Sequence, residues 1–385
     1  MIQENRSFNN LFMGYPGATT ATSGLNSSGQ TIPLAPVSLA AKKDIEHLSA
    51  DFFAACDGNP PGQNCKMDGW NNEIYGPANF PYAYVPRKQV KPYWDMAGQY
   101  VLADNMFASN IDASFVAHQY AVAAYASGAV DLPTGTWGCG GGGSDTVNTL
   151  NQDRSYGSPI APCFDNVSLA QELDAAGLPW RYYVTESSGG VWDGYQAISP
   201  IYNGPDWTAD TANPSTQFLT DVANGNLAAV TWITPSEQDS DHSSSDSKKG
   251  PSWVASVVNA VGNSKFWNDT AIFVMWDEWG GWYDPVAPPY EDYDGLGFRV
   301  PLLVISPYAK QGYVSHVQYE TASVLRFIED DFGLAQMAAA DARANDPAGD
   351  CFNFSQQPRA FKKIAAEVPA SVFVRERTGA PPDDE

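Results

Sequence analysis

The sequence predicts an α/β fold, a three-layer sandwich in which helices cover both faces of a mostly parallel central sheet. Two observations predict it. Short apolar runs alternate along the chain with segments of helical spacing, which is typical of strands joined by crossover helices. The apolar runs are also continuous, as expected for strands that are buried on both faces.

Five apolar runs are predicted to be strands, and four segments of helical spacing lie between them. In chain order the predicted strands are residues 100–103, 180–184, 227–233, 271–276 and 300–305. The predicted helices are residues 114–126, 169–176, 252–261 and 319–332. Three segments rich in Gly, Ser, Thr, Asn and Pro are predicted to be long irregular loops, namely residues 14–36, 127–160 and 195–214.

The start of the chain differs from the usual pattern of this fold class. An α/β chain usually begins with a buried strand, but only Met1, Ile2 and Gln3 precede the polar residue Glu4. We therefore expect a first strand that is truncated at the N-terminus, with the true start and any export signal lying upstream.

Charge and composition exclude several classes of protein. The chain of 385 residues carries 21 Lys and Arg against 44 Asp and Glu, a net charge of −23. Proteins that bind nucleic acid by neutralising its phosphates need a basic face, so no nucleic-acid partner is expected. No run approaches the roughly 18 apolar residues of a membrane span. With 43% hydrophobic and 13% aromatic residues, the chain can bury a large core, which excludes general disorder.

Four of the five cysteines bracket short polar loops. We expect disulfides between Cys56 and Cys65 and between Cys139 and Cys163, although buried free thiols are the alternative. Cys351 would then remain as a buried, inert thiol. Disulfides form under oxidising conditions, so the protein is expected to be secreted or periplasmic.

Polar side chains follow the predicted strands at their carboxyl ends. Glu4 and Asn5 follow the first short strand, and Asp277 and Glu278 follow residues 271–276. In parallel sheets such residues meet at one edge, where ligands bind. Adjacent carboxylates repel each other unless a cation lies between them, and oxygen ligands suit hard divalent ions. A capping or solvated acidic pair is the alternative.

A serine begins the predicted helix after residues 100–103. Ser114 could be no more than the N-cap of that helix. The N-terminus of a helix also favours an anion, so a serine there is a candidate nucleophile with built-in charge stabilisation. His118 lies one turn later on the same helical face.

The remaining histidines are candidates for proton transfer or for structural hydrogen bonds. His242 lies in a Ser-rich loop beside Asp241, which we expect to orient it and raise its pKa, as a general acid requires. For His47 and His316 a structural role is an equal alternative.

Six segments together resemble a known family. They are ENRSFNNLF from Glu4, EHLSADFFAACDG from Glu46, ADNMFAS with DASFVAHQY from Ala103, the pair Asp241-His242, MWDEWGGWYDPVAPP from Met275, and SHVQYETASVLRFIEDDFGL from Ser315. In this order they are similar to the phosphoesterase family of bacterial phospholipases C and acid phosphatases, which has the alkaline phosphatase fold. The resemblance implies a single phosphoesterase domain over residues 1–376. Residues 377–385 are expected to be a disordered tail.

The resemblance also implies roles for the candidate residues. One divalent metal ion, whether Ca, Mg, Mn or Zn, would be held by Glu4, Asn5, Asp277 and Glu278. Ser114 matches the nucleophile of the family.

Other matched positions concern the substrate. His242 matches the histidine that meets the leaving group. The family motifs place the remaining candidates near the substrate, namely His47, His118, Asp241 and His316. The chain departs from the family at Ala113, where many relatives have Pro, and at residues 9–10, where an Asp-His pair is often found.

Together, these observations predict a metal-dependent hydrolase of phosphoric esters that forms a phosphoserine intermediate. Its substrate would be a small-molecule or lipid phosphate ester, as for an acid phosphatase or a phospholipase C. Two alternatives from other classes are an extracellular carbohydrate enzyme, using carboxylates such as Glu237 and Glu278, and a non-catalytic binding protein.

Overall fold

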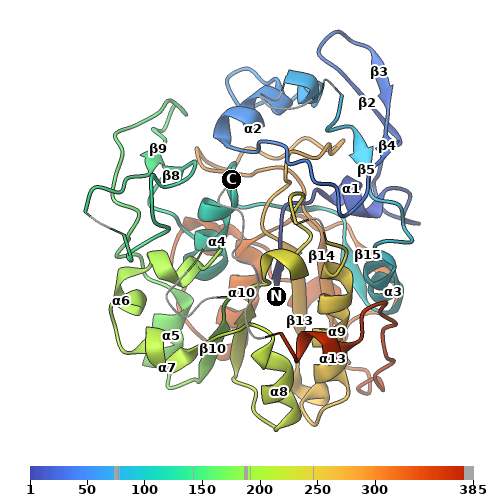
Figure 1. Ribbon diagram of the computed structural model, residues 1–385, viewed down its shortest axis with the longest axis vertical. Coiled ribbons are helices and arrows are strands. Elements are labelled where there is room, and N and C mark those ends of the chain that lie inside the picture. Colours follow the sequence, from blue (N-terminus) through green and yellow to red (C-terminus); the bar gives the residue numbers. More distant parts are fainter. Residues whose placement is uncertain are drawn as a thin grey trace.

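The computed structural model describes residues 1–72, 77, 79–141, 143–185, 190, 192–245 and 247–376. The predicted tail, residues 377–385, lies outside the described residues. A five-stranded sheet with the order β1-β13-β14-β6-β15 forms the centre of the molecule (Figure 1). Its strands are β1 (Ile2–Gln3), β13 (Ile272–Trp276), β14 (Leu302–Ile305), β6 (Val101–Ala103) and β15 (Tyr313–Ser315).

The direction of one strand differs from the prediction of a mostly parallel sheet. β1 runs parallel to β13, and β6 runs parallel to β15, but β14 is antiparallel to both of its neighbours. The segment between β13 and β14 contains no helix among the described elements, so the chain turns back without the crossover that a parallel connection needs. The central sheet is therefore mixed, and its three-layer arrangement stays a prediction.

A second sheet is wholly parallel and has the order β11-β10-β12. Its strands are β11 (Thr211–Ala212), β10 (Trp180–Tyr183) and β12 (Val230–Ile233). The four predicted helices appear as α4 (Ser114–Ala123), α5 (Leu169–Ala175), α9 (Gly250–Gly262) and α10 (Ala322–Phe332). The last of these begins later than predicted because Tyr319–Glu320 forms a strand, β16, that pairs with β7 (Met106–Phe107).

The segments predicted to be irregular loops contain short elements instead. Within them lie β2 (Ser23–Leu25), β3 (Thr31–Pro33), β4 (Ala35–Pro36), β8 (Ala129–Val130), β9 (Asn148–Thr149), α6 (Ser199–Tyr202) and α7 (Asp206–Asp210). Elements this short show no detectable periodicity. Also not predicted were α1 (Phe8–Phe12), α2 (Ser49–Cys56), β5 (Ala83–Tyr84), α3 (Lys91–Gln99), α8 (Gln217–Ala223), α11 (Ala339–Arg343), α12 (Ala348–Cys351) and α13 (Ala370–Phe373).

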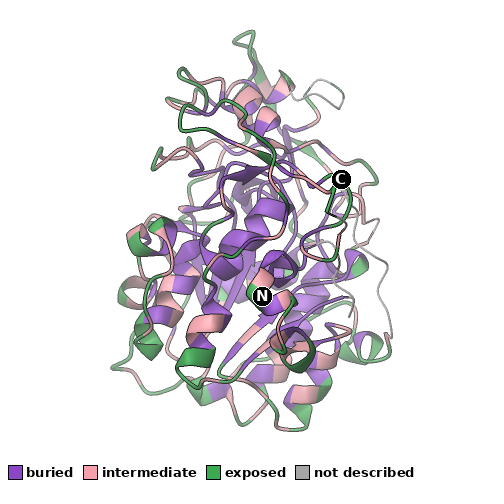
Figure 2. Ribbon diagram, turned by 90° about the vertical axis from the view of Figure 1, so that its left-hand side faces the viewer, coloured by how far each residue is buried: buried purple, intermediate pink, exposed green. Residues whose placement is uncertain are grey.

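The strands of the central sheet are buried along their length. Every residue of β6, β13 and β14 is buried, as predicted from their continuous apolar runs. Figure 2 shows this buried interior, with exposed residues gathered in the outer loops and on the outer helices. Apolar burial on this scale is the main source of stability in a chain of this length. None of the helices in the described part of the chain has the length and apolar character needed to cross a bilayer.

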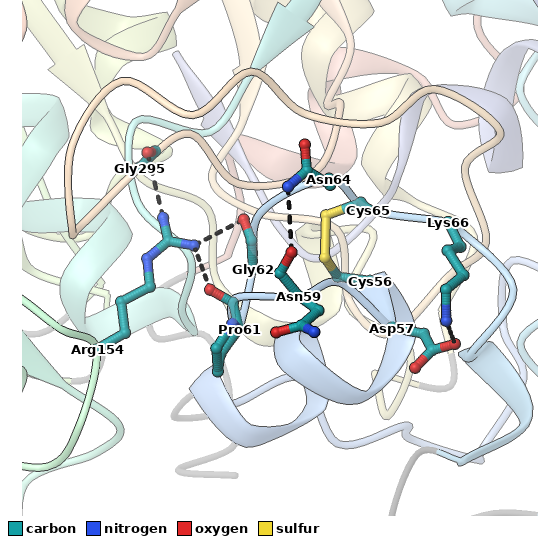
Figure 3. The surroundings of a disulfide bond; sticks show 10 residues. All are labelled: Cys56, Asp57, Asn59, Pro61, Gly62, Asn64, Cys65, Lys66, Arg154 and Gly295. Carbon is teal, nitrogen blue, oxygen red and sulfur yellow. Dashed lines mark hydrogen bonds and ion pairs between the residues drawn. A yellow bond between two sulfur atoms is a disulfide. The ribbon is translucent and has the colours of Figure 1, made fainter.

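Both predicted disulfides are present, and Cys351 is a free, buried thiol. The bond between Cys56 and Cys65 joins the end of α2 to the loop that follows it (Figure 3). Arg154 fastens the same loop from outside by donating hydrogen bonds to the carbonyl oxygens of Pro61 and Gly62. The loop is thus held at both ends and in the middle.

A cavity of about 700 Å³ lies between β12 and the strands β1 and β13. Its lining is largely apolar and includes Phe218, Val257, Phe273 and Phe327. None of the predicted site residues lines it. The residues that could perform chemistry therefore have to be sought at the carboxyl ends of the strands.

Candidate active site

The pairing of β1 with β13 brings the two acidic motifs together. Gln3 lies opposite Trp276, so the residues that follow each strand become neighbours at the same edge of the sheet. The backbone N–H of Asn5 donates a hydrogen bond of 2.9 Å to Asp277 Oδ1. Glu4, Asn5, Asp277 and Glu278 are all buried. The structure thus gathers the four residues in one place, as the strand-end rule predicts.

A glycine next to the second motif allows this close packing. Gly280 has a φ of +60°, and a Cβ at its position would lie 2.1 Å from the carbonyl oxygen of Asn5. Any other residue would push the two motifs apart. The backbone N–H of Gly280 also donates to Glu278 Oε2 at 2.6 Å and so fixes that carboxylate.

His118 joins the carboxylates. Its Nε2 lies 3.2 Å from Glu4 Oε1 and 3.9 Å from Asp277 Oδ2. One ligand atom from each of these three residues lies within 4.8 Å of the other two. The sequence placed His118 near the substrate; the geometry places it among the candidate metal ligands. In the sequence, its spacing from Ser114 and its place in a family motif indicated only that it lies near the site.

Ser114 is the first residue of α4, and Ala113 occupies the N-cap position. The capping alternative for Ser114 is therefore wrong. The Ser114 hydroxyl donates to Asn5 Oδ1 at 3.3 Å, which connects the start of the helix to the candidate metal-binding residues. The Asp112 carboxylate accepts hydrogen bonds from the N–H groups of Ala113 and Asp131 and fixes the turn before the helix. Burial and the nearby Asp131 charge raise the pKa of Asp112 well above its ordinary value.

His47 lies on the other side of Asn5. Its Nδ1 is 2.6 Å from the carbonyl oxygen of Ile45, which can only accept, so Nδ1 carries a proton. In the neutral ring Nε2 then accepts from Asn5 Nδ2 at 2.9 Å. Nε2 is also 3.6 Å from Glu278 Oε1. The His47 ring lies 6.4 Å from the ring of His242, so His242 stands at the border of the same group.

Asp241 does not orient His242, contrary to the expectation from their adjacency. The Asp241 carboxylate accepts hydrogen bonds from Tyr93 Oη at 2.7 Å and from Trp276 Nε1 at 3.1 Å. The partner of His242 Nδ1 is Ser244 Oγ, at 2.8 Å. Adjacency in the sequence does not place two side chains in contact, and only the folded loop shows which partners each one has.

His316 lies apart from this group. It follows β15, and its Nδ1 is 2.7 Å from Asp104 Oδ1 at the end of β6. Its side chain is 62% exposed. Among the described residues its contacts are with Asp104 and Asn105, away from the group around Asn5, so the structure does not bring it to the site.

The buried location of Asp241 predicts a specific pH dependence of stability. Burial raises the pKa of Asp241 to about 6, although hydrogen bonds from Tyr93 and Trp276 and the charge of Arg6 act in the opposite direction. The unfolded value is about 3.9, so the unfolded chain releases a proton that the folded protein retains. Stability therefore falls as the pH rises from about 4 to 6, by at most about 3 kcal/mol.

Asp241→Asn should remove this part of the pH dependence. Urea unfolding of both proteins at pH 4.5 and pH 8 measures it. We expect a smaller loss of unfolding free energy between the two pH values in the variant. Equal losses in the two proteins would contradict the assignment.

The donor set fits a divalent cation. Glu4, Asp277 and Glu278 bring three carboxyl groups into a buried space, where a cation offsets their mutual repulsion. Asp277 Oδ2 is buried and accepts no hydrogen bond from the residues that the structure describes. His118 adds a nitrogen ligand, so the set combines the oxygen ligands that Mg²⁺, Ca²⁺ and Mn²⁺ prefer with an imidazole that suits Zn²⁺.

Comparisons with known proteins agree on one family. The sequence model described as "Phosphoesterase family" matches residues 1–335. The non-hemolytic phospholipase C of Burkholderia pseudomallei is 25% identical over 402 residues, which cover 86% of this chain and 54% of that protein. Phospholipase C B of Mycobacterium tuberculosis is 26% identical, with 94% of this chain and 78% of that protein covered. The chain thus spans about half the length of the first relative.

Solved structures show weaker similarity. A protein in the alkaline phosphatase superfamily from Vibrio parahaemolyticus has a TM-score of 0.39 and 10% identity, covering 78% of this chain and 69% of that one. A phosphonate monoester hydrolase from Silicibacter pomeroyi has a TM-score of 0.38 and 14% identity, covering 70% and 73%.

Proposed function

This chain belongs to the phosphoesterase family, and we propose that it is a metal-dependent hydrolase of phosphoric esters in which Ser114 is the nucleophile. One observation carries the proposal. Ser114 Oγ bonds to Asn5, and Asn5 connects directly to Asp277 within the group of Glu4, His118 and Asp277. A nucleophile, a set of metal ligands and a helix N-terminus therefore meet at one point.

The start of α4 contributes to the reaction by its position. Ser114 attacks phosphorus in line with the bond to the leaving oxygen, and the helix N-terminus favours the negative charge on the phosphoryl oxygens. A bound divalent ion, held by Glu4, Asp277 and His118 with Asn5 and Glu278 beside them, would lower the pKa of the nucleophilic hydroxyl and balance the phosphoryl charge. Three buried carboxylates would otherwise repel a phosphate ester.

His242 completes the proposed first step. It donates a proton to the leaving oxygen as the ester P–O bond breaks, and a phosphoserine at Ser114 remains. Water then hydrolyses this intermediate. His47, fixed by Ile45 and Asn5, borders the same space and would contact the phosphoryl group.

The names of the relatives indicate the class of substrate. Phospholipases C cleave phosphodiesters, so a lipid or small-molecule phosphodiester is the proposed substrate class, ahead of a monoester. Because the chain belongs to the phosphoesterase family, this proposal takes the place of the two alternative functions, a carbohydrate enzyme and a non-catalytic binding protein. The two disulfides fit an oxidising compartment, and we place the protein outside the cytoplasm as part of the same proposal.

A substrate panel tests the proposal. Release of nitrophenol from nitrophenyl phosphate and from bis(nitrophenyl) phosphate, and of phosphocholine from phosphatidylcholine, would be measured with Mg²⁺, Mn²⁺, Ca²⁺ or Zn²⁺. We expect turnover of at least the diester with one of the ions. No turnover of any ester with any ion would contradict the proposal.

A further inference from the structure

The turn before α4 is held by one buried side chain, that of Asp112. Its Oδ1 accepts a hydrogen bond of 2.7 Å from the backbone N–H of Ala113, and its Oδ2 accepts one of 2.9 Å from the backbone N–H of Asp131. Asn110 Nδ2 donates to the carbonyl oxygen of Asp112 at 3.0 Å. Asp112 is fully buried, where such bonds are stronger than in water. The residue directly before the N-cap of α4 is therefore fixed at three points.

Asp131 anchors this turn to distant parts of the chain. It follows β8 directly. Its Oδ1 accepts a hydrogen bond of 2.8 Å from Ser49 Oγ, at the start of α2, and its Oδ2 accepts one of 3.0 Å from Asn148 Nδ2, in β9. The bond from the N–H of Asp131 to Asp112 thus links the start of α4 to three elements that are remote from it in the sequence.

The start of α4 lacks the usual N-cap. The cap position is usually taken by Ser, Thr, Asp or Asn, whose side-chain oxygen accepts an N–H group of the first helical turn. Ala113 has no such oxygen, and no side chain of the described residues caps this helix. Asp112 bonds instead to the N–H of Ala113, which precedes the first turn. It therefore fixes the start of the helix without occupying the N–H groups that the proposed function assigns to the phosphoryl oxygens.

We infer that Asp112 is a positioning residue that holds the Ser114 hydroxyl in line for attack on phosphorus. The inference rests on the proposed function. Ser114 is the first residue of α4 and follows Asp112 by two positions, so a shift of the turn moves its Oγ directly. A displacement of about 1 Å in a reacting group can cost about 100-fold in rate. The side chain of Asp112 bonds to backbone N–H groups, so its effect on the reaction passes through the position of Ser114.

Asp112→Asn tests the inference, because the amide keeps the shape of the side chain but can accept only one of the two N–H bonds. Both oxygens of an Asp side chain have lone pairs in either protonation state, whereas an amide nitrogen can only donate. We expect kcat for bis(nitrophenyl) phosphate to fall about 100-fold. KM and the inhibition constant for inorganic phosphate should change by less than about 3-fold, because a misplaced nucleophile weakens the transition state and not the binding of the ester.

A smaller change and a matched control accompany this variant. Asn110→Ala removes the bond to the Asp112 carbonyl oxygen and should lower kcat about 10-fold with KM unchanged, which keeps the inference testable if Asp112→Asn does not fold. Asp341 is another fully buried Asp at a helix start, and its side chain accepts the N–H groups of Ala338 and Ala342 of the α11 region. Asp341→Asn should lower the melting temperature about as much as Asp112→Asn and leave kcat near the wild-type value.

A double-mutant cycle separates positioning from a general effect on the fold. Because Asp112 acts through the Ser114 hydroxyl, Asp112→Asn should change the residual rate of Ser114→Ala by less than about 3-fold. A further fall of about 100-fold in that background, or a wild-type kcat in Asp112→Asn, would overturn the inference and leave the proposed function intact. A Ser114→Ala enzyme with the wild-type rate would overturn the proposed function itself, and Asp112 would then have no nucleophile to position.

Discussion

Ser114→Ala is expected to lower kcat for bis(nitrophenyl) phosphate by at least about 10⁴-fold, because it removes the atom that attacks phosphorus. The fold should persist. The Ser114 hydroxyl makes one hydrogen bond of 3.3 Å, to Asn5, and the N-cap of α4 is Ala113, so the helix does not depend on it. We expect the free energy of unfolding to change by no more than about 1 kcal/mol. Steady-state kinetics and thermal unfolding measure the two effects.

A serine of similar surroundings serves as the control for this prediction. Ser256 is a buried residue of α9 whose hydroxyl bonds to the carbonyl oxygen of Ser252. Ser256→Ala should change stability by a similar amount and leave kcat near the wild-type value. A Ser114→Ala enzyme that retains the wild-type rate would rule out Ser114 as the nucleophile.

The sequence predicted the parts of the site that depend on regular structure. Asp277 follows a strand of five consecutive apolar residues, and Glu4 follows a strand parallel to it. Residues that follow two parallel strands lie at the same edge of the sheet, so the sequence already predicted that the two motifs would be neighbours. The position of Ser114 at a helix start was equally visible, because the helix has a long apolar pattern.

The parts that the sequence did not predict depend on loops and on strand direction. Residues 300–305 read as one more parallel strand, since a buried antiparallel strand has the same apolar composition. The choice between Asp241 and Ser244 as the partner of His242 depends on the turn between them, which no periodic pattern describes. His118 could be identified as a candidate metal ligand only from the tertiary position of Glu4.

The net charge of −23 is unfavourable for binding the proposed substrate, which is a negatively charged phosphate ester. An acidic protein repels a phosphate ester at long range, so attraction has to arise locally, at the start of α4 and at the cation. The three buried carboxylates add to the repulsion unless the cation is present. We therefore expect the proposed cation to raise both the stability of the site and its affinity for phosphate.

Removal of the divalent ion is expected to reduce the rate of ester hydrolysis by at least about 100-fold, and added ion should restore it. The same treatment should lower the melting temperature, because an ion that binds only the folded protein stabilises it. Asp277→Asn should abolish both responses. Metal content of the purified proteins, measured by mass spectrometry, and melting curves with and without a chelator check these results.

The metal-free proteins provide the sharper comparison. Asp277→Asn neutralises one of three buried carboxylates and keeps an oxygen that can accept the Asn5 N–H, so the metal-free variant should melt at or above the temperature of the metal-free wild type. Asp269→Asn, a change in the η4 turn (Trp267–Asp269) away from the site, should behave as the wild type does in every measurement. If chelation destabilised Asp277→Asn as much as the wild type, the ion would be bound elsewhere, because a carboxylate that holds it cannot be neutralised without loss of affinity.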